Sequence, residues 1–229
     1  MNIQIRPLRV LVALVSLIGF LTLANIAVLV LKIVFDHDHV FGLVSMFDFN
    51  SEMNVPTFYS SLIIVLASIL LAIIGMYRRR DNSAYKAWFG LAFIFLFLAV
   101  DEFASIHEGL MEPAGTLMDA SGFLFHVWIV PYAIALLVFV GSYIKFLLTL
   151  PRTIMWLFIG SGALFVAGAL GMESLGGRHL ELYGPDGYYY FMTTCEELLE
   201  MVGIALFVYT LLSYIAAETP GIRLSVGGS

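Results

Sequence analysis

Six long blocks of apolar residues, separated by short polar connections, run through the chain. Each block is about as long as, or longer than, the ~20 residues that an α-helix needs to cross a ~30 Å hydrocarbon core. The pattern predicts an all-α integral membrane protein, a six-transmembrane-helix bundle that forms a single domain over residues 1–229. The predicted spans cover residues 8–34, 56–77, 87–110, 122–149, 153–173 and 190–216.

Composition agrees with this class and limits the partners. Hydrophobic residues make up 61% of the chain and charged residues 12%, whereas soluble proteins average about 45–50% and about 25%. The net charge of -6 argues against nucleic acid as a partner, and membrane lipid is the expected contact. Ala163, Ala167 and Gly171 have the spacing that lets helices pack closely, so a homo-oligomer or a larger membrane complex is left open.

Charged residues divide between the two sides of the predicted membrane. Nine of the eleven Lys and Arg residues fall on one side, whereas fifteen of the seventeen carboxylates and all five histidines fall on the other. By the positive-inside rule the basic side is cytoplasmic, which predicts that both termini are cytoplasmic. The short loops favour the bacterial inner (cytoplasmic) membrane.

The third predicted span carries a group of polar residues near its outer end. If the helix continues to residue 110, a rotation of about 100° per residue places Asp101, Ser105 and Glu108 on one stripe. Glu102 is then turned about 100° away, and His107 is adjacent to Glu108. Two carboxylates and a hydroxyl are therefore expected to face one direction.

The sixth predicted span carries three glutamates. Thr193, Glu196 and Glu200 share one helix face, and Glu197 lies only about 60° beyond Glu200. Glu200 is roughly 15 Å along the helix from Tyr190, near the bilayer midplane. These glutamates are expected to look into the same cavity as the acids of the third span, with Glu200 approaching Asp101.

Two more polar residues are predicted at a similar depth, and few cations are available to neutralise the group. His126 lies on the fourth predicted span, and Glu173 lies at the outer end of the fifth. A charged side chain at the centre of a membrane helix costs roughly 2.5–3.5 kcal/mol on the insertion scale. Only Lys32 and Arg178 lie on this side. Protons, water or a bound cation must therefore compensate the carboxylates.

A divalent metal is the favoured interpretation of this group. Carboxylates with one or two imidazoles suit iron, zinc or manganese. The spacing differs from that of known di-metal bundles, and we find no zinc-protease motif or other named catalytic signature. A protonated or water-filled polar cluster remains an alternative, and a haem between His107 and His126 is the least favoured one. The predicted metal ligands are Asp101, His107, Glu108, His126, Glu173, Glu196 and Glu200, and the predicted proton-transferring catalytic residues are Glu197 and Glu102.

Three classes of function are compatible with the sequence. The first is a metal-dependent membrane enzyme that acts on a lipid-like or quinone-like substrate. The second is an accessory or assembly subunit of a larger membrane complex, which would present the acids on the outside of the bundle. The third is a cation or proton transporter, which would continue the polar path to the cytoplasmic side. The sequence does not decide whether the chain is an enzyme.

Four short segments outside the polar group are expected to have structural roles rather than to bind a metal. Residues 47–56, which include Glu52, are interpreted as an interfacial lid. Residues 36–39, Asp-His-Asp-His, are interpreted as a solvated loop. Pro131 is expected to bend the fourth span. Gly176 and Gly177 are expected to end the fifth span.

Overall fold

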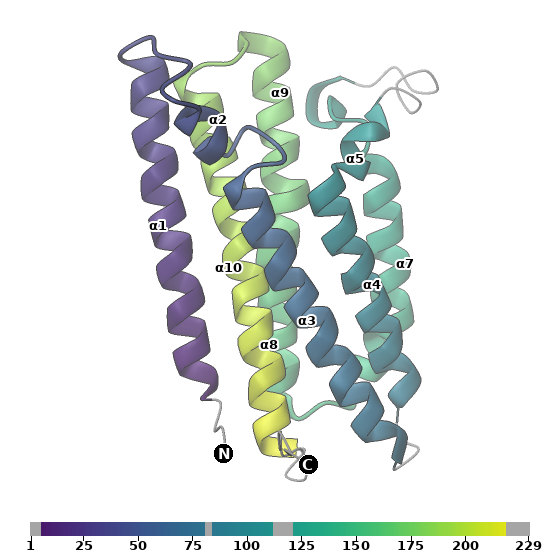
Figure 1. Ribbon diagram of the computed structural model, residues 1–229. Helices are drawn as coiled ribbons and strands as arrows, with labels where there is room; N and C mark the ends of the chain where they lie inside the picture. The colour runs from purple at the N-terminus through teal and green to yellow at the C-terminus, as the bar shows by residue number, and fades with distance from the viewer. Residues whose placement is uncertain (1–5, 81–83, 112–120, 219–229) are drawn as a thin grey trace.

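The computed structural model describes residues 6–80, 84–111 and 121–218, which are helices joined by loops (Figure 1). Six helices within these ranges are long and apolar enough to cross a membrane, as the sequence predicts. They are α1 (Pro7–Ile33), α3 (Val55–Arg80), α4 (Tyr85–Ala104), α7 (Ile129–Leu147), the continuous run Arg152–Tyr183, and α10 (Gly187–Glu218). The run Arg152–Tyr183 consists of α8 (Arg152–Val166), the π-helical segment η2 (Ala167–Met172) and α9 (Glu173–Tyr183). Short helices lie between the long ones: α2 (Leu43–Phe47), α5 (Ile106–Gly109) and the 3-10 turn η1 (Gly122–Leu124).

Three predicted helix boundaries are wrong, and each error has a local cause. The third span ends at Ala104 rather than residue 110, because Ser105 has a φ of 47° in the left-handed region. The fourth begins at Ile129 rather than residue 122. Pro131 is then the third residue of that helix, where its missing N–H has no helical partner to lose, so the reason for the predicted bend is removed. The fifth continues to Tyr183.

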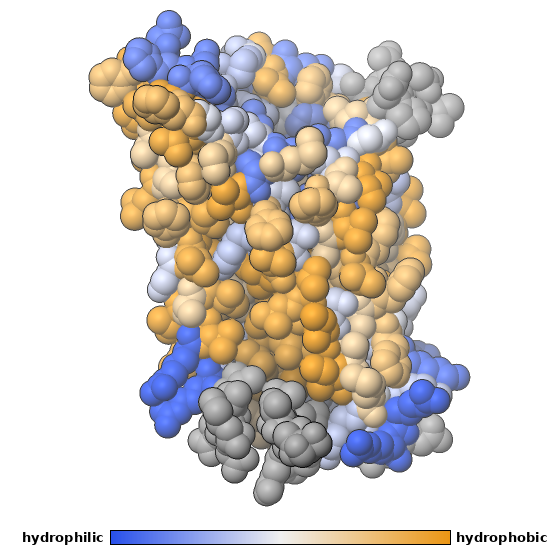
Figure 2. Space-filling view, in the orientation of Figure 1, coloured by the Kyte–Doolittle hydropathy of each residue, from blue (hydrophilic) through white to orange (hydrophobic). Residues whose placement is uncertain are grey.

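Helix α10 lies at the centre of the bundle. It packs against α1, α3, α8, η2 and α9, while α3 packs along α4. Helix α1 begins and α10 ends at the same end of the bundle, and α5 lies at the opposite end (Figure 1). The visible surface is mainly apolar through its middle, with hydrophilic residues at both ends (Figure 2). The end of the bundle where α1 begins and α10 ends carries Arg78, Arg79 and Arg80 and is called the basic end. Fully buried apolar residues fill the half of the bundle nearer this end, among them Leu71, Ile74, Val208 and Leu211.

Helices α8 and α10 approach so closely that only glycine fits between them. A Cβ atom added to Gly203 would lie 2.7 Å from the backbone nitrogen of Phe165 and 3.0 Å from the carbonyl oxygen of Ser161. These neighbours are backbone atoms and cannot rotate away. By contrast, Ala163 and Ala167, two members of the predicted small-residue series, lie on the exposed side of the run. The close packing within the chain therefore uses a different face.

The loop after α2 is fixed to α1 by polar contacts, and one of the α1 residues involved also bonds to α10. The Asn25 side chain, which is 0% exposed, accepts a hydrogen bond from the Phe49 backbone N–H at 2.9 Å. It also donates to the Thr194 hydroxyl at 2.9 Å. Lys32 pairs with Asp48 at 2.9 Å. The segment predicted as a lid is thus anchored to α1, which is itself bonded to α10 through Asn25.

Replacing Asn25 with leucine is expected to lower the free energy of unfolding by about 2 kcal/mol, because the buried Phe49 N–H loses its acceptor. Thermal unfolding in detergent measures the effect. Ser16→Ala is the matched control on α1, since that exposed hydroxyl bonds only to the Val12 carbonyl of its own helix. Equal stability of Asn25→Leu and wild type would show that the anchor contributes nothing.

Candidate metal centre

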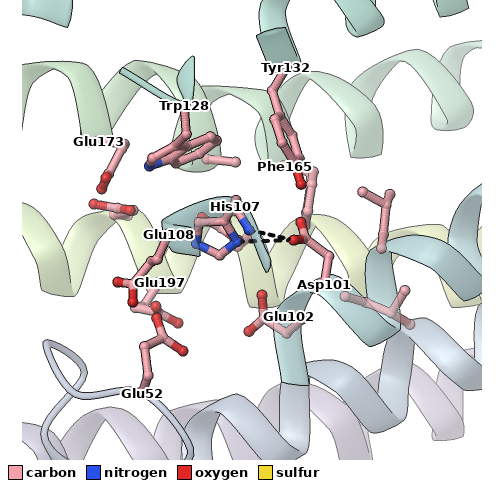
Figure 3. Close-up of a pocket in the computed structure, with 15 residues that line it drawn as sticks. Glu52, Asp101, Glu102, His107, Glu108, Trp128, Tyr132, Phe165, Glu173 and Glu197 are labelled. Atoms are coloured by element: carbon pink, nitrogen blue, oxygen red, sulfur yellow. Dashed lines mark hydrogen bonds and ion pairs between the residues drawn. The ribbon is translucent and has the colours of Figure 1, made fainter. Parts of the chain in front are cut away.

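A cavity of about 110 Å³ lies in the half of the bundle away from the start of α1 and the end of α10 (Figure 3). Its walls come mainly from α4, α5 and α10, and α3, α7, α8, η2, α9 and the loop after α2 also contribute. Within the described ranges, no Lys or Arg is part of the wall. The lining residues are Glu52, Ile64, Leu98, Asp101, Glu102, His107, Glu108, Trp128, Tyr132, Phe165, Ala169, Glu173, Glu196, Glu197 and Glu200.

The break between α4 and α5 re-aims the polar residues of the third span. In an unbroken helix, Glu102 and Glu108 would face different directions. The left-handed conformation of Ser105 turns the chain, so that Glu102 and Glu108 both line the cavity. Instead of the predicted single stripe of Asp101, Ser105 and Glu108, the residues of this region that line the cavity are Asp101, Glu102, His107 and Glu108. Asp101 is buried and its Oδ1 accepts the backbone N–H of His107 at 2.8 Å.

Glu52 completes the outer part of the cavity, although the sequence predicted only a lid role for its segment. It receives a hydrogen bond from the Ser105 hydroxyl at 3.3 Å. One potential ligand atom from each of Glu52, His107 and Glu108 lies within 4.8 Å of the others. Burial, followed by the nearby charge of Glu108, raises the pKa of Glu52. Helical periodicity could not reveal this residue, because loop residues have no fixed facing direction.

His107 connects these acids to the buried Asp101. Burial by itself lowers the pKa of His107, but the hydrogen bond and charge of Asp101 and the charges of Glu52 and Glu102 together outweigh it, so the pKa is raised. The imidazole packs against Trp128, with 4.7 Å between ring centroids. Tyr132 also lines the cavity. Trp128 and Tyr132 were missed by the sequence reading, because aromatic residues near a span end are typical of an ordinary membrane interface.

The inner part of the cavity is built by α10 and the π-helical segment. Glu196, Glu197 and Glu200 line it from α10. A Cβ atom on Gly168 of η2 would lie 2.7 Å from Cγ of Glu200, so this glycine lets α10 approach. Glu173 begins α9 directly after η2. Both Asp101 and Glu200 line this one cavity, in keeping with the approach predicted for them.

His126 differs from the other predicted ligands. It lies in the loop before α7 rather than on a span, and it is not among the described residues that line the cavity. Its Nδ1 contacts Oε1 of Glu173. A Cβ atom on Gly177 would lie 3.3 Å from this Nδ1, so the glycine provides room for the imidazole. Gly176 and Gly177 therefore do not end the helix; both are buried within α9.

A known protein family matches most of this sequence. Residues 9–214 match the family described as Domain of unknown function (DUF8692). The chain belongs to this family. The matched range contains every residue that lines the cavity. No curated protein and no solved structure matches the chain.

Proposed function

We propose that the chain is a metal-dependent membrane enzyme, with a divalent metal held by Glu52, His107 and Glu108. The proposal rests on one observation: these three residues bring their ligand atoms within 4.8 Å of one another, beside further carboxylates and no Lys or Arg in the described wall. Two carboxylates and an imidazole form a mixed oxygen and nitrogen ligand set that suits manganese, iron or zinc. A metal also supplies the positive charge that the wall lacks.

The other acids of the cavity receive supporting roles. Such a metal lowers the pKa of a bound water or carries electrons. Glu102 and Glu197 line the cavity outside the group of three ligands, so they remain free to accept and return protons. Glu173, Glu196 and Glu200 extend the carboxylate wall inward, where shared protons would balance them, and His126 supports Glu173.

The surroundings of the cavity favour a lipid-like or quinone-like substrate. Ile64, Leu98 and Phe165 form apolar parts of its wall. Met53, next to Glu52, is 81% exposed, and Phe103, next to Glu102, is 54% exposed. At about 110 Å³ the cavity admits only a small reacting group. The remainder of an amphiphilic substrate would lie against these exposed apolar side chains and the bilayer.

Two observations favour an enzyme over the other classes. A transporter needs a polar path through the bundle, whereas fully buried Leu71, Ile74, Val208 and Leu211 lie between the cavity and the basic end. An accessory subunit that pairs its acids with a partner would present them outward, whereas here they line an internal cavity. We also propose that the protein lies in the bacterial inner membrane, in keeping with its short loops. Both termini would be cytoplasmic, because nine of the eleven Lys and Arg residues fall on that side of the predicted spans.

Elemental analysis of detergent-purified protein tests the proposal. The protein is prepared without chelator and without metal-affinity chromatography. We expect about one equivalent of manganese, iron or zinc per chain, removed by chelator and restored by Mn²⁺. Purified protein that contains no metal and takes up no Mn²⁺, Fe²⁺ or Zn²⁺ contradicts the proposal.

A further inference from the structure

The break between α4 and α5 is built around one buried carboxylate. Ser105 adopts a left-handed conformation that residues other than glycine seldom take. Asp101, four residues earlier, is 5% exposed. Its Oδ1 accepts the backbone N–H of His107 at 2.8 Å. The carboxylate thus satisfies an N–H in the first turn of α5 that has no helical acceptor.

The same carboxylate oxygen faces the imidazole ring. Nδ1 of His107 lies 3.4 Å from Oδ1 of Asp101. The imidazole stands between Asp101 on one side and Glu108 on the other (Figure 3). A carboxylate beside Nδ1 favours a proton on that nitrogen, which leaves Nε2 without a proton in the neutral ring. Packing against Trp128 restricts the ring plane.

We propose that Asp101 is a positioning residue that holds the Nδ1–H tautomer of His107 and directs Nε2 toward Glu52 and Glu108. The use of Nε2 as a ligand rests on the proposed metal function, but the tautomer does not. Histidines that bind metals usually donate their second ring N–H to a carboxylate or carbonyl. Asp101 would then act through His107, although the sequence predicted a direct ligand. Its Oδ1 already contacts two atoms of His107.

Two variants of Asp101 test the tautomer directly. Asp101→Leu removes the acceptor, whereas Asp101→Asn keeps an oxygen in nearly the same place. Nitrogen NMR of histidine-labelled, metal-free protein is recorded at a pH of about 9, where imidazole is neutral. The His107 signal is identified by its loss in His107→Ala. We expect the Nδ1–H tautomer in wild type and Asp101→Asn, and a shift toward Nε2–H in Asp101→Leu.

Mn²⁺ titration of the same variants tests the use of Nε2. The EPR signal of free Mn²⁺ should give a Kd at least about tenfold higher in Asp101→Leu, with a smaller increase in Asp101→Asn and unchanged stoichiometry. If Asp101→Leu does not fold, Asp101→Ala is the second variant without an acceptor.

Three outcomes separate the two proposals. A wild-type tautomer in the variants without an acceptor overturns the positioning role. Complete loss of Mn²⁺ from Asp101→Asn also overturns it, because this result identifies Asp101 as a ligand. Wild-type protein that binds no Mn²⁺ but shows an Asp101-dependent Nδ1–H tautomer refutes the metal function and supports the positioning of the ring.

Discussion

Replacing His107 with alanine is expected to reduce bound metal from about one equivalent to below about 0.1 per chain, because a site with only three protein ligands loses its single nitrogen. The two remaining glutamates would face each other without a cation. Elemental analysis and Mn²⁺ titration measure the loss. The overall fold should survive, since α5 is short and lies at one end of the bundle (Figure 1).

Two controls make this result specific. His37→Ala removes an imidazole from the exposed loop at residues 36–39 and should leave the bound metal unchanged. Glu200→Gln preserves the shape of a side chain that lines the inner cavity, outside the group of three ligands, and should also retain the metal. If His107→Ala keeps its metal while either control loses it, the assigned ligand set is wrong.

Replacing Gly203 with alanine is expected to lower the free energy of unfolding by about 3 kcal/mol, because the added methyl group meets backbone atoms that cannot move aside. Its Cβ would lie 2.7 Å from the nitrogen of Phe165. Helices α8 and α10 must then separate.

The matched control is Gly162→Ala on α8, where an added Cβ meets no atom within 4 Å. Alanine favours helix over glycine by about 1 kcal/mol, so this variant should be as stable as wild type or more stable. Thermal melting in detergent compares the two proteins. Equal melting temperatures for Gly203→Ala and Gly162→Ala would contradict the tight α8–α10 contact.

The six long helices could be predicted from the sequence, because membrane-length apolar blocks leave few other structures. The ends of these helices could not. The break at Ser105 depends on the Asp101 side chain, which reaches a backbone N–H six residues later. Gly176 and Gly177 suggested that the helix would stop, but α9 continues through them. The space beside Gly177 is occupied by the His126 imidazole. In both cases a tertiary contact outweighs the local preference of the residue.

The same reasoning explains which parts of the site were predictable. Acids on α10 could be located by helical rotation, because that helix is continuous through Glu196 and Glu200. Glu108 reaches the cavity only because the helix breaks before it. Glu52 reaches it from a loop that is anchored by Asn25 on a distant helix. Contacts between separate elements set these last two positions, and no periodic pattern encodes them.

The π-helical segment makes the site depend on chain length as well as on residue type. A π-helical turn contains one more residue than an α-helical turn would need. If residues 167–172 formed an ordinary α-helix with the same number of residues, everything after them would turn by about 100°. Glu173 and the surface at Gly177 that receives His126 would then turn away together. In this part of the chain, the number of residues is itself a determinant of where the carboxylates point.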